Sequence, residues 1–309
     1  MLLAGCARHE LRDAPAAAGG ARLIEAPFFP QEDHQCGPAA LATVLGWSGV
    51  AVAPAQLSEQ VFIPARQGSL QAEMLAAPAR HGRLGVELPK SPTALLEELD
   101  AGRPVLVLQN LGLPSQPQWH YAVLVGFDAA AGTVTLRSGR LRERVLDWST
   151  FLATWQRAGS WAMLVLRPGE LPAAADLQAY IRGALTLERA GQHSAAAEAY
   201  AAGMRRWPDA LLLPFGLANA RYAQNDLAGA EQALRLALQL DPDAMPVLNN
   251  LAQVLIEQGC PALALRYAER ALALAGERAE QVRATLEQAQ RASRTPGDCR
   301  RPAFSGEPS

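Results

Sequence analysis

The chain has 309 residues, of which 50% are hydrophobic and 19% are charged, with a formal net charge of -2. This length predicts more than one domain, and the composition is typical of a globular protein rather than a disordered one. The near-neutral charge, without a basic run interleaved with aromatic residues, argues against binding to nucleic acid. Cysteines and histidines lack paired ligand spacing and no Gly-rich phosphate loop is present, so we expect no metal and no cofactor.

The first 22 residues predict a lipoprotein-like N-terminus and a tether. Residues 3–6 spell Leu-Ala-Gly-Cys, which resembles the lipobox at which bacterial lipoproteins are cut and acylated on cysteine. The resemblance implies lipidation of Cys6 and anchoring at the periplasmic side of a bacterial membrane. An export signal needs about 7–15 apolar residues, whereas five residues precede Cys6. We therefore expect that the start codon has been placed too late and that residues 7–22 form the tether.

The segment around Cys36 predicts a cysteine at the start of a helix. Gly37 and Pro38 precede the apolar run 39–45, and proline is favoured in a first helical turn because its missing N–H needs no partner there. Unpaired backbone N–H groups and the helix dipole stabilise a thiolate at such a position. Cys36 is therefore a candidate nucleophile whose pKa we expect to be depressed.

A histidine stands at the start of a predicted strand further along the chain. Residues 119–128 are rich in branched and aromatic side chains, which is typical of a β-strand, and His120 is the second of them. An imidazole at a strand end can face a helix N-terminus across a cleft. A cysteine and a histidine in that geometry form the thiolate–imidazolium pair of papain-like enzymes.

The segments 31–40 and 119–126 together resemble the bacteriocin-processing, double-glycine-type peptidases of the papain-like superfamily. The similarity covers roughly residues 24–167. It implies an N-terminal α/β domain, of the α+β papain-like type, over residues 23–168.

The same resemblance implies a role for each candidate residue. Cys36 would be the nucleophile and His120 the general base. Gln31 would donate a side-chain hydrogen bond to an oxyanion hole that the Cys36 N–H completes. Gln35 is the competing donor, although a residue adjacent to the nucleophile normally points away from it.

Ser138 stands where these peptidases carry the Asp or Asn that orients the imidazole. It lies on the next predicted strand, residues 133–139. A hydroxyl can accept the histidine N–H, but it lacks the charge that stabilises an imidazolium. Three interpretations stay open: slow turnover, substitution by Asp147 or a backbone carbonyl, or a site that is only a remnant.

A proline-rich break at residues 167–172 separates the β-type pattern from a helical one, and we expect a linker at 169–175. The sequence then repeats with a period of 34, as in the Pro-Asp-Ala of 208–210 and 242–244. The loop positions and the small contact residues of the repeats keep the same offset: Gly191, Asn225 and Gly259; Ala184, Ala218 and Ala252; Ala196, Ala230 and Ala264. The period resembles that of tetratricopeptide repeats and implies an all-α tetratricopeptide superhelix of three repeats over 176–278.

Residues 279–309 predict a capping helix and a tail. Cys260, in the loop of the third repeat, and Cys299, in the tail, are a candidate disulfide, because a helix that folds back on the last repeat would bring them together. The bond would contribute roughly 4 kcal/mol through loop-closure entropy and would persist only in an oxidising compartment. Two independent thiols are the alternative.

These features predict a cysteine peptidase that hydrolyses peptide bonds through a Cys–His acyl-enzyme mechanism. Its partners would be a peptide or protein substrate and a protein bound on the concave repeat surface, unless the repeats only stabilise the first domain. The alternatives are a weak or inactive peptidase-like adaptor that binds peptides, which Ser138 favours, and an amidase or peptide ligase on the same scaffold.

Overall fold

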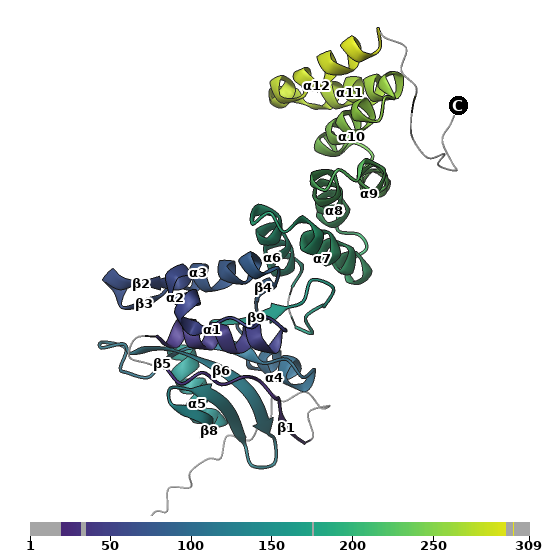
Figure 1. The fold of residues 1–309 in the computed structure, drawn as a ribbon. Coiled ribbons are helices and arrows are strands. Elements are labelled where there is room, and N and C mark those ends of the chain that lie inside the picture. Colours follow the sequence, from purple (N-terminus) through teal and green to yellow (C-terminus); the bar gives the residue numbers. More distant parts are fainter. Residues whose placement is uncertain (1–19, 32–34, 175, 295–298, 300–309) are drawn as a thin grey trace, which may run out of the picture. The chain divides into compact units, whose positions relative to one another are not determined.

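The structure is a computed structural model that describes residues 20–31, 35–174, 176–294 and 299. The chain divides into two compact units, Met1–Ala190 and Gly191–Ser309 (Figure 1). Cys6 lies outside the described residues, and its lipidation stays a prediction.

The first unit mixes short helices with the strands of one main sheet. In chain order its elements are β1 (Ala21–Leu23), α1 (Cys36–Trp47), α2 (Pro54–Val61), β2 (Phe62–Ile63), η1 (Pro64–Arg66), β3 (Gly68–Ser69), α3 (Gln71–Ala76), η2 (Ala77–His81), β4 (Leu84–Glu87), α4 (Pro92–Asp100), β5 (Val105–Asn110), β6 (Trp119–Asp128), β7 (Thr133–Ser138), β8 (Leu141–Asp147), α5 (Trp148–Arg157), β9 (Ala162–Leu166) and α6 (Leu177–Arg189).

The main sheet is antiparallel, with the order β4-β9-β5-β6-β7-β8, and β1 pairs with the far end of β6. The strands predicted at 119–128 and 133–139 are confirmed as β6 and β7. Backbones approach closely where β1 crosses β6, because a Cβ at Gly126 would collide with the carbonyl oxygen of Arg22. A glycine is therefore required at that position of β6.

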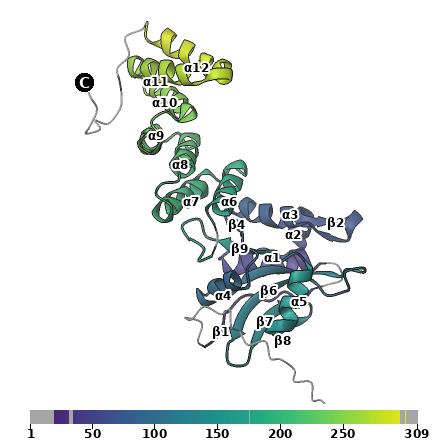
Figure 2. The same cartoon turned by 180° about the vertical axis from the view of Figure 1, so that it is seen from behind.

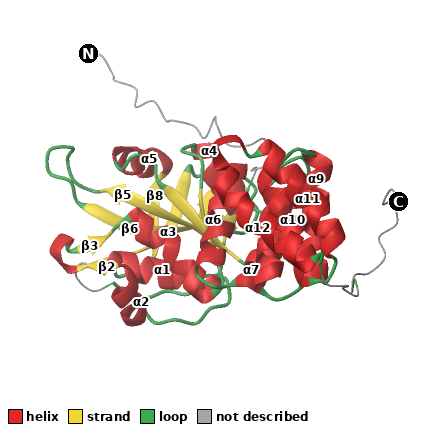
Figure 3. Ribbon diagram, turned by 90° about the horizontal axis from the view of Figure 1, so that it is seen from above, coloured by secondary structure: helices red, strands yellow, loops and turns green. Residues whose placement is uncertain are grey.

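Helices cover both faces of this sheet, and Figure 3 shows α1 on one side with α4 and α5 on the other. Alternate strand residues, such as Val123 and Val125 of β6, pack with Leu41 and Leu45 of α1 in the main apolar core. The intervening residues are also buried, and α5 lies against β5, β7 and β8 (Figure 2). Because both faces are covered, the central strands are nearly continuous apolar runs.

Helix α6 packs on the edge strand β4 and belongs to the first unit. A Cβ at Gly183 would lie 2.7 Å from the carbonyl oxygen of Gly85, so the helix and the strand are in direct backbone contact. The segment before α6 is held by Glu98, which is fully buried and accepts hydrogen bonds from the Ala174 N–H (2.8 Å) and from Arg103 Nε (2.6 Å). The predicted boundary between linker and repeats lies before this helix, whereas the division of the structure follows it.

Replacing Gly183 with alanine tests this contact. In a helix interior without this contact, replacing glycine with alanine would raise the free energy of unfolding by about 1 kcal/mol. Overpacking against a backbone oxygen should instead lower the free energy of unfolding by about 1–3 kcal/mol. Urea unfolding of Gly183→Ala should therefore show a lower midpoint than wild type. The control is Gly169→Ala, where an added Cβ meets no atom within 4 Å; a raised midpoint for Gly183→Ala would contradict the packing.

The second unit is all helical. Its elements are α7 (His193–Arg206), α8 (Leu212–Ala223), α9 (Leu227–Leu240), α10 (Met245–Glu257), α11 (Pro261–Leu274), η3 (Gly276–Arg278) and α12 (Ala279–Ala292). Each helix packs on the next along the chain from α7 to α12. The terminal helix predicted from residue 279 begins there, buries Val282 and Ala289, and exposes the Glu280–Arg283 ion pair.

The repeat period predicted from the sequence appears directly in the backbone. Gly191, Asn225 and Gly259 all have positive φ values, of 72°, 60° and 76°. This left-handed conformation is the usual end of a helix before the next one begins. The predicted small contact residues Ala196, Ala230 and Ala264 are fully buried. The predicted fold class, an α+β domain followed by an all-α tetratricopeptide-like superhelix, is confirmed.

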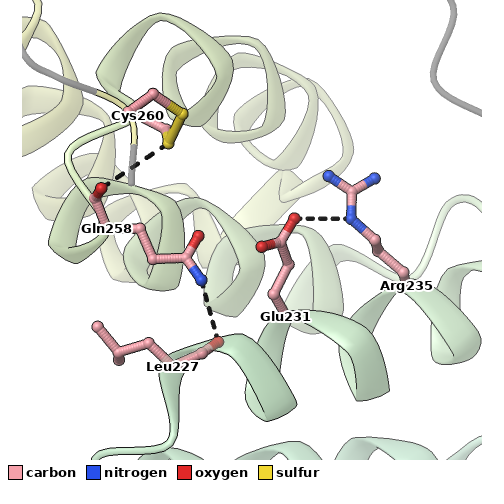
Figure 4. Close-up of a disulfide and its surroundings, with 6 residues drawn as sticks. Leu227, Glu231, Arg235, Gln258 and Cys260 are labelled. Atoms are coloured by element: carbon pink, nitrogen blue, oxygen red, sulfur yellow. Dashed lines mark hydrogen bonds and ion pairs between the residues drawn. A yellow bond between two sulfur atoms is a disulfide. The ribbon is translucent and has the colours of Figure 1, made fainter. Parts of the chain in front are cut away.

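A disulfide joins Cys260, which precedes α11, to Cys299 in the tail, with 4.5 Å between their Cα atoms (Figure 4). Cys260 is buried, and beside it Gln258 donates a hydrogen bond from Nε2 to the Leu227 carbonyl at the start of α9 (3.1 Å). The bond closes a loop of 39 residues, which corresponds to roughly 4 kcal/mol of loop-closure entropy. It ties the tail to the start of α11.

Candidate active site

Cys36 is the first residue of α1, as the sequence predicts. The helix can begin there because Pro38 occupies its first turn and the next seven residues are buried against the sheet. Backbone hydrogen bonds from Tyr121, Gly37 and Cys36 itself reach the thiol. The thiol therefore lies between the start of α1 and the start of β6.

His120 and Ser138 meet across neighbouring strands. Nε2 of His120, on β6, lies 2.9 Å from the Ser138 hydroxyl at the end of β7. Hydrogen bonding to the hydroxyl leaves Nδ1 as the ring nitrogen for another partner. The structure thus places Ser138 where an orienting residue is needed, with a hydroxyl in place of a carboxylate.

Gln31 and Gln35 lie differently with respect to the thiol. Gln31 lines the same cavity as Cys36 and His120, and its Nε2 donates a 3.4 Å hydrogen bond to the Tyr121 carbonyl. Its backbone N–H bonds to the Gly139 carbonyl, which anchors it beside the end of β7. Gln35 precedes α1 and is not among the residues that line the cavity. Gln31 therefore lies at the cavity, and its role as the side-chain donor stays a prediction.

The cavity that joins these residues has a volume of about 940 Å³. One wall is the short β2–β3 hairpin, where the Ser69 carbonyl accepts a hydrogen bond from the Tyr121 hydroxyl (3.1 Å). A Cβ at Gly37 would lie 2.9 Å from Cβ of Ser69, so the hairpin is packed tightly on the start of α1. The sequence analysis did not identify Ser69, because a two-residue strand far from Cys36 in the chain carries no recognisable pattern.

No cluster of His, Cys, Asp or Glu in the described part of the chain has the makeup of a metal site. None of the described helices is long and apolar enough to cross a bilayer.

Residues 23–163 match the model of the Peptidase_C39 like family. This part of the chain is a C39-like domain. The helical part that follows is tetratricopeptide-like. No curated protein sequence matches the chain.

Several solved structures are similar to one part of the chain or the other. A putative C39-like peptidase from Bacillus anthracis is 18% identical over 47% of this chain and 97% of its own, with a TM-score of 0.39. A double glycine motif protease from an AMS/PCAT transporter, in complex with the leader peptide, is 18% identical over 47% of this chain and 93% of its own, with a TM-score of 0.36. The Yersinia enterocolitica type III secretion chaperone SycD, in complex with a peptide of the translocator YopD, is 18% identical over 38% of this chain and 94% of its own, with a TM-score of 0.36.

The electrostatics of the C39-like domain differ from the sequence-based expectation. Burial raises the pKa of the Cys36 thiol, although the backbone hydrogen bonds around it act in the opposite direction. Burial, with the positive charge of Arg144 as a second cause, lowers the pKa of His120 to about 4. The predicted depression of the Cys36 pKa is wrong for the free protein. Burial favours the neutral forms of the thiol and the imidazole, and the described residues that line the cavity include no carboxylate.

The interpretation that Asp147 substitutes for Ser138 as the orienting residue is wrong. It pairs with Thr133 at the start of β7, whereas Ser138 ends that strand and pairs with Leu141. Five residues of extended strand separate the two positions by about 16 Å. Asp147 therefore lies at the opposite end of β7 from His120.

The protonation states predict how Cys36 reacts with iodoacetamide. The thiolate fraction falls about tenfold for each pH unit below the thiol pKa, so labelling should be slow at about pH 6 and should rise steadily beyond pH 9. Ser138→Asp would place a carboxylate beside His120, raise the imidazole pKa and stabilise an ion pair with the thiolate. Labelling at about pH 6 should then increase by about tenfold or more.

Ser138→Asn is the matched control, since it has nearly the same shape without the charge. It should leave labelling near the wild-type rate. A wild-type rate that is already high and flat between about pH 6 and pH 9, or equal effects of the two substitutions, would contradict the neutral pair.

Proposed function

We propose that the C39-like domain hydrolyses peptide bonds through a Cys–His acyl-enzyme mechanism. The observation that carries the proposal is that Cys36 and Gln31, which are near each other in the sequence, line a single cavity with the distant His120. The hydrogen bond between His120 and Ser138 supports it, because a general base must be held in one orientation.

In the proposed first step, the Cys36 sulfur attacks the substrate carbonyl as the thiol proton passes to the free nitrogen of His120. The oxyanion would accept hydrogen bonds from Gln31 Nε2 and from the Cys36 backbone N–H. His120 then gives the proton to the leaving amine, and the C–N bond breaks. A water molecule, deprotonated by His120, hydrolyses the thioester and releases the acid and the free thiol.

Proton transfer must accompany the attack, because both partners are neutral in the free protein. This requirement predicts slow turnover relative to an enzyme with a preformed ion pair. It also favours a second candidate function, a peptidase-like adaptor that binds peptides and hydrolyses them weakly or not at all.

Activity of the purified full chain on a peptide library, followed by mass spectrometry, separates these functions. Cys36→Ala should lower kcat/KM by roughly 10⁴-fold or more, and His120→Ala should have a similar effect. Gln31→Ala should lower kcat by about 10²–10³-fold. The control is Gln35→Ala, which should leave kcat unchanged because its side chain does not line the cavity. Cleavage that survives Cys36→Ala would reject the peptidase.

We also propose that the repeat unit binds the substrate or a protein partner. Tyr222 is partly exposed on α8 and bonds through its hydroxyl to Glu257 of α10 (2.5 Å). If this surface binds substrate, Tyr222→Ala should raise KM and leave kcat unchanged. An unchanged KM would contradict substrate binding at Tyr222.

A lipid-anchored location at the periplasmic side of a bacterial membrane completes the proposal. The Cys260–Cys299 disulfide supports export, because such bonds persist in oxidising compartments. In a bacterial host with an export signal placed before Cys6, the protein should appear in the membrane fraction with a lipid on Cys6. Cys6→Ser should release it or leave it unprocessed. Recovery as soluble protein with free Cys260 and Cys299 would contradict the location.

A further inference from the structure

Two arginine side chains line the cavity around Cys36 from separate segments. Arg66 ends η1 on the β2–β3 hairpin, and Arg140 lies in the β7–β8 turn, two residues after Ser138. Both are exposed, and neither forms an ion pair with another described residue. Among the described residues that line the cavity, none is an aspartate or a glutamate. The described walls therefore carry positive charge only.

A third guanidinium acts on the same site from β8. After burial, the positive charge of Arg144 is the second cause that lowers the pKa of His120. Charges of one sign around a concave, partly desolvated site add up and attract ligands of opposite charge. Among the described residues, the charges around the base of the proposed reaction are therefore positive.

The size and rim of the cavity fit an extended peptide. Its volume of about 940 Å³ exceeds what one side chain fills and lies at the upper end of the range for ligand pockets. Trp119 and Leu70, which are 56% and 40% exposed, also line it and offer apolar contacts. Guanidinium groups bind carboxylates with two parallel hydrogen bonds, so they add geometric as well as electrostatic selectivity.

We propose that this cavity selects peptides with aspartate or glutamate close to the scissile bond, through Arg66 and Arg140. The position of the acidic residue relative to a scissile bond rests on the proposed peptidase function. The binding of acidic peptides by the cavity does not depend on that function. A carboxylate held by these arginines would also offset the positive field that opposes protonation of His120.

Binding to the full-length Cys36→Ala protein tests the selectivity without requiring turnover. Three fluorescein-labelled peptide pools of equal length, rich in Glu, in its neutral isostere Gln, or in Lys, are compared by fluorescence anisotropy. The Glu pool should bind about tenfold more tightly than the Gln pool at low salt, and the Lys pool should bind weakest. The difference should shrink as salt rises to about 1 M.

Substitution of the arginines identifies the origin of the preference. Arg66→Gln and Arg140→Gln should each reduce the advantage of Glu over Gln, and the double variant should remove it. Arg80→Gln is the matched control, since Arg80 is exposed in η2 and does not line the cavity. Equal binding of the Glu and Gln pools, or an advantage that survives the double variant, would overturn the proposal.

Failure of the proposed function gives a different result. If the Glu pool binds with the predicted dependence on Arg66 and Arg140 but wild-type protein cleaves no peptide, the selectivity is confirmed and the peptidase function is rejected. If wild-type protein cleaves Glu and Gln peptides with equal kcat/KM and binds them equally, the peptidase function is confirmed and the selectivity is rejected.

Discussion

The packing of α1 against the sheet is the constraint on which the candidate site depends. Nine consecutive residues, from Gly37 to Leu45, are buried, and this apolar contact determines how the helix is rotated and placed against β6. Cys36 is the residue at the end of that buried run, so the core fixes the position of the thiol. A helix turns by about 100° per residue, and a shift of one residue would therefore carry the thiol out of the cavity. Helix α1 and strand β6 therefore belong both to the core of the fold and to the candidate site.

The same burial explains the chemistry of the pair. A thiol and an imidazole taken out of water both favour their neutral forms, and Ser138 supplies orientation without a compensating negative charge. The positive charge of Arg144 acts in the same direction on the imidazole. The C39-like domain therefore holds a thiol, an imidazole and a glutamine amide at one cavity, in an environment that disfavours a resting ion pair. That combination explains why weak hydrolysis and peptide binding are the two functions to be separated.

Local patterns in the sequence were sufficient to predict the secondary-structure elements and several residues of the candidate site. The Gly-Pro turn predicted the start of α1. The period of 34 predicted three loop residues, Gly191, Asn225 and Gly259, and the structure shows them in the left-handed conformation. The prediction was incomplete where distant segments meet. Strand register placed Asp147 away from His120, and burial reversed the expected pKa of Cys36. The roles of Ser69 and Arg66 depend on how one hairpin docks beside α1, which no local pattern encodes.

The protonation state of His120 tests the central claim most directly. ¹⁵N NMR of histidine-labelled protein reports the charge and tautomer of each ring, and the His120→Gln variant identifies the signal of His120. We predict a neutral ring at neutral pH that titrates with a pKa of about 4, and a higher pKa in Ser138→Asp. A wild-type His120 that is doubly protonated at neutral pH would contradict the neutral pair and restore the thiolate–imidazolium couple.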